Sequence, residues 1–289
     1  MFQGTHRSIS SAGLILALAT WPAAAAEIPG AIAFAPHRAI YDVSLARAAP
    51  GTGVADMSGR LVYELKGSTC EGYTQDMRFV TTSSSSEGGD QVNDMRTTSF
   101  EEPGGRTMRF NSTQYHDSQA AEVTQGQAGR RAKDGAIQIE LTKPAHKALS
   151  LPPGTYFPIQ HSIALLEAAR TGKKLFVGDV YDGSEKGDKV SATNTMIGKP
   201  GTGDGDHLPS GVANVERLRG VAYWPVATSY FERDKSFDQK DMMPNYEMAA
   251  HFYENGVSTK LLMDYGEFAL KGELIELTFL PEQPCPATK

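Results

Sequence analysis

The chain has 289 residues and a formal net charge of −6 at pH 7, with 28 Lys and Arg against 34 Asp and Glu. This length is enough for one large domain or two small domains with a well-buried core. The mildly acidic balance, without a stripe of basic residues, argues against a nucleic-acid partner.

The first 26 residues have the pattern of a secretory signal peptide. His6 and Arg7 precede an apolar run at 9–19, and small residues follow at 23–26. The run is too short for a hydrocarbon core of roughly 30 Å, and an Ala-x-Ala site is typical of a removable leader. We therefore expect cleavage near Ala26, export to the periplasm, and a mature chain that does not span the membrane.

The mature chain has the pattern of an antiparallel β-protein. Short alternating segments recur between Gly, Pro, Asn, Asp and Ser, which is typical of a sheet with one buried face. Asn255-Gly256 and Asp134-Gly135 are strong hairpin signals. The expected strands cover 37–47, 58–66, 73–82, 93–101, 106–112, 136–142, 174–181, 189–197, 221–233, 246–254, 257–265 and 267–280.

One segment, 159–170, has a helical period. Ile163, Leu166 and Ala169 are spaced three apart. Pro158 precedes the segment and Thr171-Gly172 ends it. Proline is favoured at the start of a helix and glycine just after its end. A single helix against many strands predicts a helix laid across a curved sheet. The polar stretches 83–90 and 199–210 are expected to be loops, and 27–289 a single domain.

The two cysteines, Cys70 and Cys285, are expected to form a disulfide. An exported chain with two cysteines offers one intramolecular pairing, and an oxidising compartment favours the bridge over two free buried thiols. Their spacing is not the C-x-x-C of a redox enzyme, so a structural bridge is preferred. Closing so long a loop stabilises the fold by roughly 5 kcal/mol in the chain-entropy model.

Motifs of catalysis do not appear. The sequence has no G-x-S-x-G, S-x-x-K or H-E-x-x-H pattern. It therefore lacks the usual signatures of serine hydrolases and zinc hydrolases. We expect no catalytic residues of these types and no cofactor. A fold-assembled carboxylate pair leaves no spacing rule in a sequence, so a periplasmic hydrolase of an envelope polymer stays an alternative.

A group of acids is the one candidate for a metal. Asp179, Asp182, Glu185 and Asp188 are three apart around Gly183 and could converge on a calcium ion through a turn. The order of acids differs from that of a calcium-binding loop, and a solvated hairpin tip explains the segment equally well.

Four strings carry a resemblance over essentially the whole mature chain. They are His-Arg-Ala-Ile-Tyr at 37–41, Cys-Glu-Gly-Tyr at 70–73, Leu-Pro-Pro-Gly-Thr-Tyr-Phe-Pro at 151–158 and Tyr-Asp-Gly-Ser at 181–184. Together with the signal peptide, they resemble the cell envelope integrity protein EipB family of alphaproteobacteria. The resemblance implies a mainly β fold, in which a long curved antiparallel sheet, a β-spiral like an open barrel, wraps around one amphipathic helix.

The resemblance also implies a disulfide between an early strand and the C-terminus, at the positions of Cys70 and Cys285, and a periplasmic role in envelope integrity without established enzyme activity. The implied architecture is similar to that of periplasmic lipoprotein carriers. Apolar surface between helix and sheet could open as a groove for an acyl chain or a partner peptide. Its candidate lining is Ile159, Ile163, Leu166 and Ala169.

We therefore expect a non-enzymatic binding protein. Its partner is expected to be a periplasmic or outer-membrane-associated protein, or the acyl chain of a lipid or lipoprotein. Two alternatives stay open for the same features. The helix could be a plain core helix, and an exposed sheet edge could serve strand addition to a partner.

Overall fold

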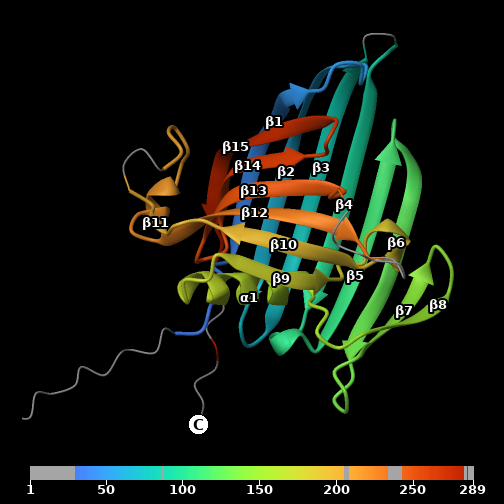
Figure 1. The fold of residues 1–289 in the computed structure, drawn as a ribbon, viewed down its shortest axis with the longest axis vertical. Coiled ribbons are helices and arrows are strands. Elements are labelled where there is room, and N and C mark those ends of the chain that lie inside the picture. The colour runs from blue at the N-terminus through green and yellow to red at the C-terminus, as the bar shows by residue number, and fades with distance from the viewer. Residues whose placement is uncertain (1–29, 86–87, 205–207, 234–242, 283–284, 286–289) are drawn as a thin grey trace, which may run out of the picture. The chain divides into compact units, whose positions relative to one another are not determined.

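Antiparallel pairing joins fifteen strands into one long sheet in the computed structural model (Figure 1). The structure describes residues 30–85, 88–204, 208–233, 243–282 and 285, so the expected signal peptide lies outside them. The described residues from Ile32 onward form one compact unit. The strands are β1 His37–Ala48, β2 Val54–Ser68, β3 Gly72–Ser85, β4 Gln91–Glu101, β5 Thr107–His116, β6 Gln119–Arg130, β7 Ile137–Lys143, β8 Lys147–Leu151, β9 Leu175–Val180, β10 Ser191–Ile197, β11 Gly201–Thr202, β12 Ala222–Glu232, β13 Tyr246–Tyr253, β14 Ser258–Asp264 and β15 Phe268–Phe279.

The strand order places the first and last strands, β1 and β15, side by side in the middle of the sheet. It runs β8-β7-β6-β5-β4-β3-β2-β1-β15-β14-β13-β12-β10-β9, with β11 paired to β12. The strands at the two ends, β8 and β9, are not joined, so the sheet is long and curved but not closed into a barrel. In Figure 1, β9, β10 and β12 to β15 cross in front of β2 to β5. The expected mainly β fold is confirmed.

Alternation of side chains explains which face of the sheet is buried. In β1, Tyr41 and Val43 are buried whereas Asp42 between them is exposed, because successive side chains in a strand point to opposite faces. Tyr41 pairs with Leu61 of β2 and with Leu274 of β15. Apolar residues of neighbouring strands therefore form continuous rows on the inner face.

The hairpin signals are confirmed at both places. Asn255-Gly256 connects β13 to the antiparallel β14, and Asp134-Gly135 connects β6 to β7. Gly256 has φ +89° and Gly135 has φ +70°. These left-handed conformations favour glycine.

Three strands were not expected from the sequence. The strand β6 is rich in Gln, Ala and Gly, and so lacks the apolar alternation of the others. Its inner face needs small residues, because a Cβ on Gly126 would lie 2.8 Å from Phe110 Cζ. The short β8 was also not expected, and β11 lies inside the expected loop 199–210. The expected loop 83–90 begins within β3, which continues to Ser85.

The helix α1, Pro158–Arg170, has the start and stop that the sequence predicts. The N–H of Gly172 donates to Ala169 O at 3.0 Å, and the N–H of Lys173 donates to Ala168 O at 3.0 Å. Gly172 has φ +77°, which completes a Schellman motif. Within the described residues, no helix combines the length and the apolar character needed to cross a membrane.

Candidate binding site around helix α1

The apolar face of α1 lies in a core cluster that it shares with strands of the sheet. Ile159, Leu166 and Ala169 are buried, and Ile163 is partly buried against the same cluster. The cluster is completed from both halves of the sheet, by Leu65 and Tyr73 of β2 and β3 and by Ile197 and Trp224 of β10 and β12. The four residues of the expected groove are therefore together on one helix face, which now packs as core.

A buried carboxylate holds the start of α1. Pro158 has no N–H, and the N-cap Phe157 offers no side-chain acceptor. Glu101, the last residue of β4, supplies both missing acceptors: Ile159 N–H donates to its Oε1 at 2.7 Å and Gln160 N–H to its Oε2 at 3.4 Å. The first turn of a helix leaves such donors without partners. A strand far from α1 in the sequence thus caps the helix.

The surroundings of Glu101 change its acidity. Its side chain is buried, with 1% of the residue exposed. Burial raises the pKa of the Glu101 carboxyl from 4.5 to about 7, and the hydrogen bonds from Ile159 and Gln160 act in the opposite direction. The N-terminal end of α1 therefore rests on a group that titrates near neutral pH.

A second titratable group ties α1 to the sheet one turn later. His161 Nε2 lies 2.8 Å from Thr193 Oγ1 of β10, and that hydroxyl donates to Gly178 O of β9 at 2.8 Å. Because the hydroxyl proton is used by Gly178, Thr193 accepts from His161, which places the imidazole proton on Nε2. Burial lowers the pKa of His161 to about 4, so the imidazole is neutral at physiological pH.

Sequence reasoning missed both Glu101 and His161. Glu101 lies two residues beyond Ser99, so both side chains point to the inner face of β4. An acidic residue at an inward position of an alternating strand was the sequence signal for a buried functional group. His161 lies on the same side of α1 as buried Leu165, four residues later. A polar residue inside an apolar stripe was the signal there.

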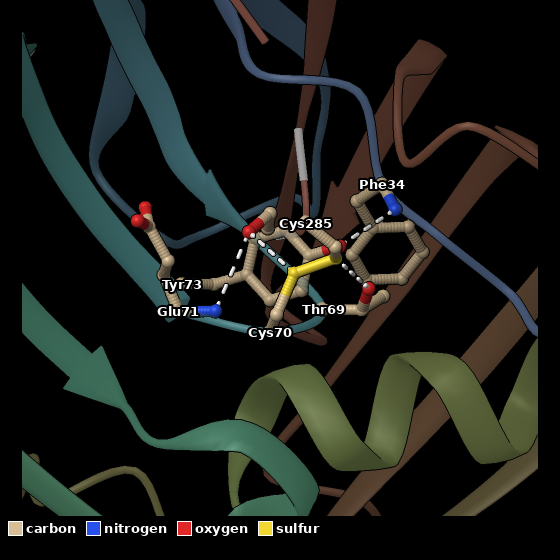
Figure 2. Close-up of a disulfide and its surroundings, with 7 residues drawn as sticks. Phe34, Thr69, Cys70, Glu71, Tyr73 and Cys285 are labelled. Atoms are coloured by element: carbon tan, nitrogen blue, oxygen red, sulfur yellow. Dashed lines mark hydrogen bonds between the residues drawn. A yellow bond between two sulfur atoms is a disulfide. The ribbon is translucent and has the colours of Figure 1, made fainter. Parts of the chain in front are cut away.

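The disulfide is present between Cys70 and Cys285, with Cα atoms 5.7 Å apart across a separation of 215 residues. Cys70 lies in the turn between β2 and β3, and Figure 2 shows the bridge beside Phe34, Thr69 and Tyr73. The N–H of Phe34 donates to Tyr73 Oη at 3.0 Å. Since Tyr73 packs in the same cluster as α1, the bridge fixes the chain's C-terminal end near the helix.

A cavity of about 400 Å³ adjoins the bridge. It is lined in part by Phe34, Tyr73, Phe279, Arg217 and Glu282. The guanidinium of Arg217 stacks over the Phe279 ring, with Cζ 4.0 Å from the centroid. Among the described residues that line this cavity, Glu282 is the single carboxylate, so the pair needed for glycoside hydrolysis is not assembled there.

The four acids of the calcium candidate are not brought together. Asp179 pairs with Arg233, Asp188 accepts from Lys147 Nζ at 2.7 Å, and Glu185 pairs with Lys189 at 2.7 Å. The fourth, Asp182, accepts the N–H of Ser184 at 2.9 Å in a tight turn. No group of three or more His, Cys, Asp or Glu side chains in the described parts of the chain could hold a metal ion. The turn with separately paired acids is the structure observed.

Comparisons with known proteins agree with this architecture. The family model described as EipB-like matches residues 29–281. The cell envelope integrity protein EipB of Brucella abortus (strain 2308) is 37% identical over 256 residues, which is 88% of each protein. A crystal structure of a beta-barrel-like protein of a domain of unknown function from Brucella abortus is similar, with TM-score 0.77 and 35% identity over 87% of this chain and all of that one. This chain belongs to the EipB-like family.

Proposed function

We propose that this protein is a non-enzymatic periplasmic protein that supports cell envelope integrity by binding an envelope protein or a lipidated ligand along α1. The name of the 37% identical relative supports the envelope role. The observation that carries the binding step is the position of α1. Its apolar face closes the space between two halves of a sheet that is itself open at β8 and β9.

Displacement of α1 would expose a continuous apolar surface. Ile159, Leu166 and Ala169 would leave Leu65 and Trp224, and their former contacts would line a groove suited to an acyl chain. Polar contacts between described residues resist this movement. They include the two hydrogen bonds to Glu101, the hydrogen bond from His161 to Thr193, and the ion pair of Arg170 with Glu254.

The test is native mass spectrometry of the mature protein purified from the periplasm without detergent. We expect extra mass that matches an acyl-bearing molecule, and less of it for Ile163→Asp, which places a charge on the groove face. Glu167→Gln is the matched control, because Glu167 is exposed on the same helix. A bare mass for wild type, together with no protein crosslinked to α1 in the intact envelope, would contradict the proposal.

The envelope role has a separate test. A strain that lacks this protein is expected to be sensitive to detergent, and the wild-type gene is expected to restore growth. Restoration by a variant lacking the signal peptide would contradict a periplasmic site of action.

A further inference from the structure

A second hollow lies on the face of the sheet opposite to α1. It crosses β4, β5, β6 and β7 and has a volume of about 400 Å³. Phe100, which lines it, precedes Glu101 in β4, and neighbours in a strand point to opposite faces. Glu101 reaches α1, so this hollow, the outer groove, is separate from the proposed binding site on the inner face.

Two rows of side chains in register form the outer groove. The first row runs Phe100, Arg109, Gln127 and Glu140 across four consecutive strands. The second row runs Thr98, Asn111 and Gln125, and Thr142 completes it by donating its hydroxyl to Gln125 O at 3.2 Å. Both rows line the groove. Side chains on adjacent strands lie about 5 Å apart, so the polar groups form a two-row grid.

The grid is balanced in charge and rich in groups that both donate and accept. Its cation, Arg109, has its Cζ 5.1 Å from the centroid of the Phe100 ring, which holds the guanidinium at the groove. Its anion, Glu140, accepts from Gln127 Nε2 at 2.8 Å.

Several ligand classes fit this surface poorly. An acyl chain would cover the side-chain amides, hydroxyls and charged groups of the two rows and leave them without hydrogen-bond partners. A polyanion would meet Glu140 as well as Arg109. A peptide that binds as an added strand needs the open edge of a sheet, but the strands β4 to β7 are paired on both sides.

We propose that the outer groove binds a neutral saccharide chain. Side-chain amides, hydroxyls, a guanidinium and a carboxylate match the paired donor and acceptor character of sugar hydroxyl and acetamido groups. Asn111 and Gln127 supply amides from neighbouring rows, and the Phe100 ring supplies an apolar contact at the end of the groove. The shallow, open form suits a stretch of polymer that remains partly in water.

The test is titration of the isotope-labelled mature protein with an N-acetylglucosamine tetramer, followed by NMR. We expect shifts of backbone amides in β4 to β7 and a dissociation constant in the millimolar range. Asn111→Ala and Gln127→Ala are each expected to weaken binding about fivefold to tenfold, as the loss of one or two hydrogen bonds predicts. Both residues are exposed, so equal thermal stability of variant and wild type confirms that folding is retained.

Gln138→Ala is the matched control. Gln138 is an exposed glutamine of β7 whose Nε2 donates to Ser150 Oγ at 2.8 Å, away from the groove lining. If Asn111→Ala fails to fold, Thr142→Ala on the other side of the second row replaces it. The proposal would be overturned by shifts confined to regions outside β4 to β7, by no response at millimolar sugar, by equal binding of all variants, or by a response to an anionic tetrasaccharide alone.

Discussion

Replacement of Glu101 by Gln tests how the start of α1 is held. In the wild type, both carboxylate oxygens accept backbone N–H groups of α1, from Ile159 and Gln160. Gln keeps one acceptor oxygen and the same size but cannot ionise. The variant therefore removes the pH-dependent part of the interaction while the size of the side chain at this position is kept.

The expected pH dependence follows from the pKa of Glu101, which burial raises from 4.5 to about 7. Between these values the folded protein keeps the proton whereas the unfolded chain has lost it, so the free energy of unfolding falls as the pH rises through this window. The stabilisation is fully present below pH 4.5. Its loss amounts to about 3 kcal/mol, at about 1.4 kcal/mol for each unit of pKa.

The assay is urea denaturation of wild type and Glu101→Gln from pH 4 to pH 8, about one unit beyond the window at its upper end. We expect the stability of wild type relative to the variant to decline by about 3 kcal/mol over this range. Parallel pH profiles would refute the reasoning, and a relative gain of wild type with rising pH would show that the helix N-terminus, which favours an anion, outweighs burial.

Three further predictions concern the same region. Burial lowers the pKa of His161 from 6.5 to about 4, so the free energy of unfolding should fall by about 3 kcal/mol as the pH falls through that interval. His161→Gln should abolish this loss in acid denaturation. An unchanged pH profile of the variant would contradict the role of His161. Cys70→Ser and Cys285→Ser should each lower the free energy of unfolding by about 5 kcal/mol or somewhat less under oxidising conditions, and equal melting temperatures of wild type and both variants would disprove a stabilising bridge. Leu166→Ala, at a position with 0% exposure, should destabilise by about 2 to 5 kcal/mol, whereas Glu167→Ala should change thermal stability little; similar losses for both would contradict core packing of the helix.

Local patterns anticipated the elements whose inner face is apolar. In β1 and β2 the alternation is strong, and the buried residues Tyr41 and Leu65 lie where it places them. In β6 the same rule failed, because the space beneath the strand is already filled by Phe110 and Leu141 and leaves room for Gly126 and no larger residue. Packing against neighbours far along the chain selected small residues there, and small residues carry no periodic signal.

The acids around Gly183 show that spacing in the sequence does not place side chains together. Their spacing suggested convergence, but each finds a different partner from another part of the chain, such as Arg233 for Asp179 and Lys147 for Asp188. Spacing along a strand and turn does not decide where side chains point once alternation and local turns separate them. The resulting ion pairs lie near the surface and contribute little individually.

The sequence by itself determined the mainly β class, the two hairpin turns, the ends of α1 and the pairing of Cys70 with Cys285, because these depend on local periodicity, turn chemistry and a cysteine count that leaves one partner. Only the tertiary structure decided that Glu101 caps α1, that Thr193 accepts a hydrogen bond from His161, and that two rows of polar residues line the outer groove. Each of these joins residues from separate strands, and their proximity is set by strand order and register, which no local stretch of sequence encodes.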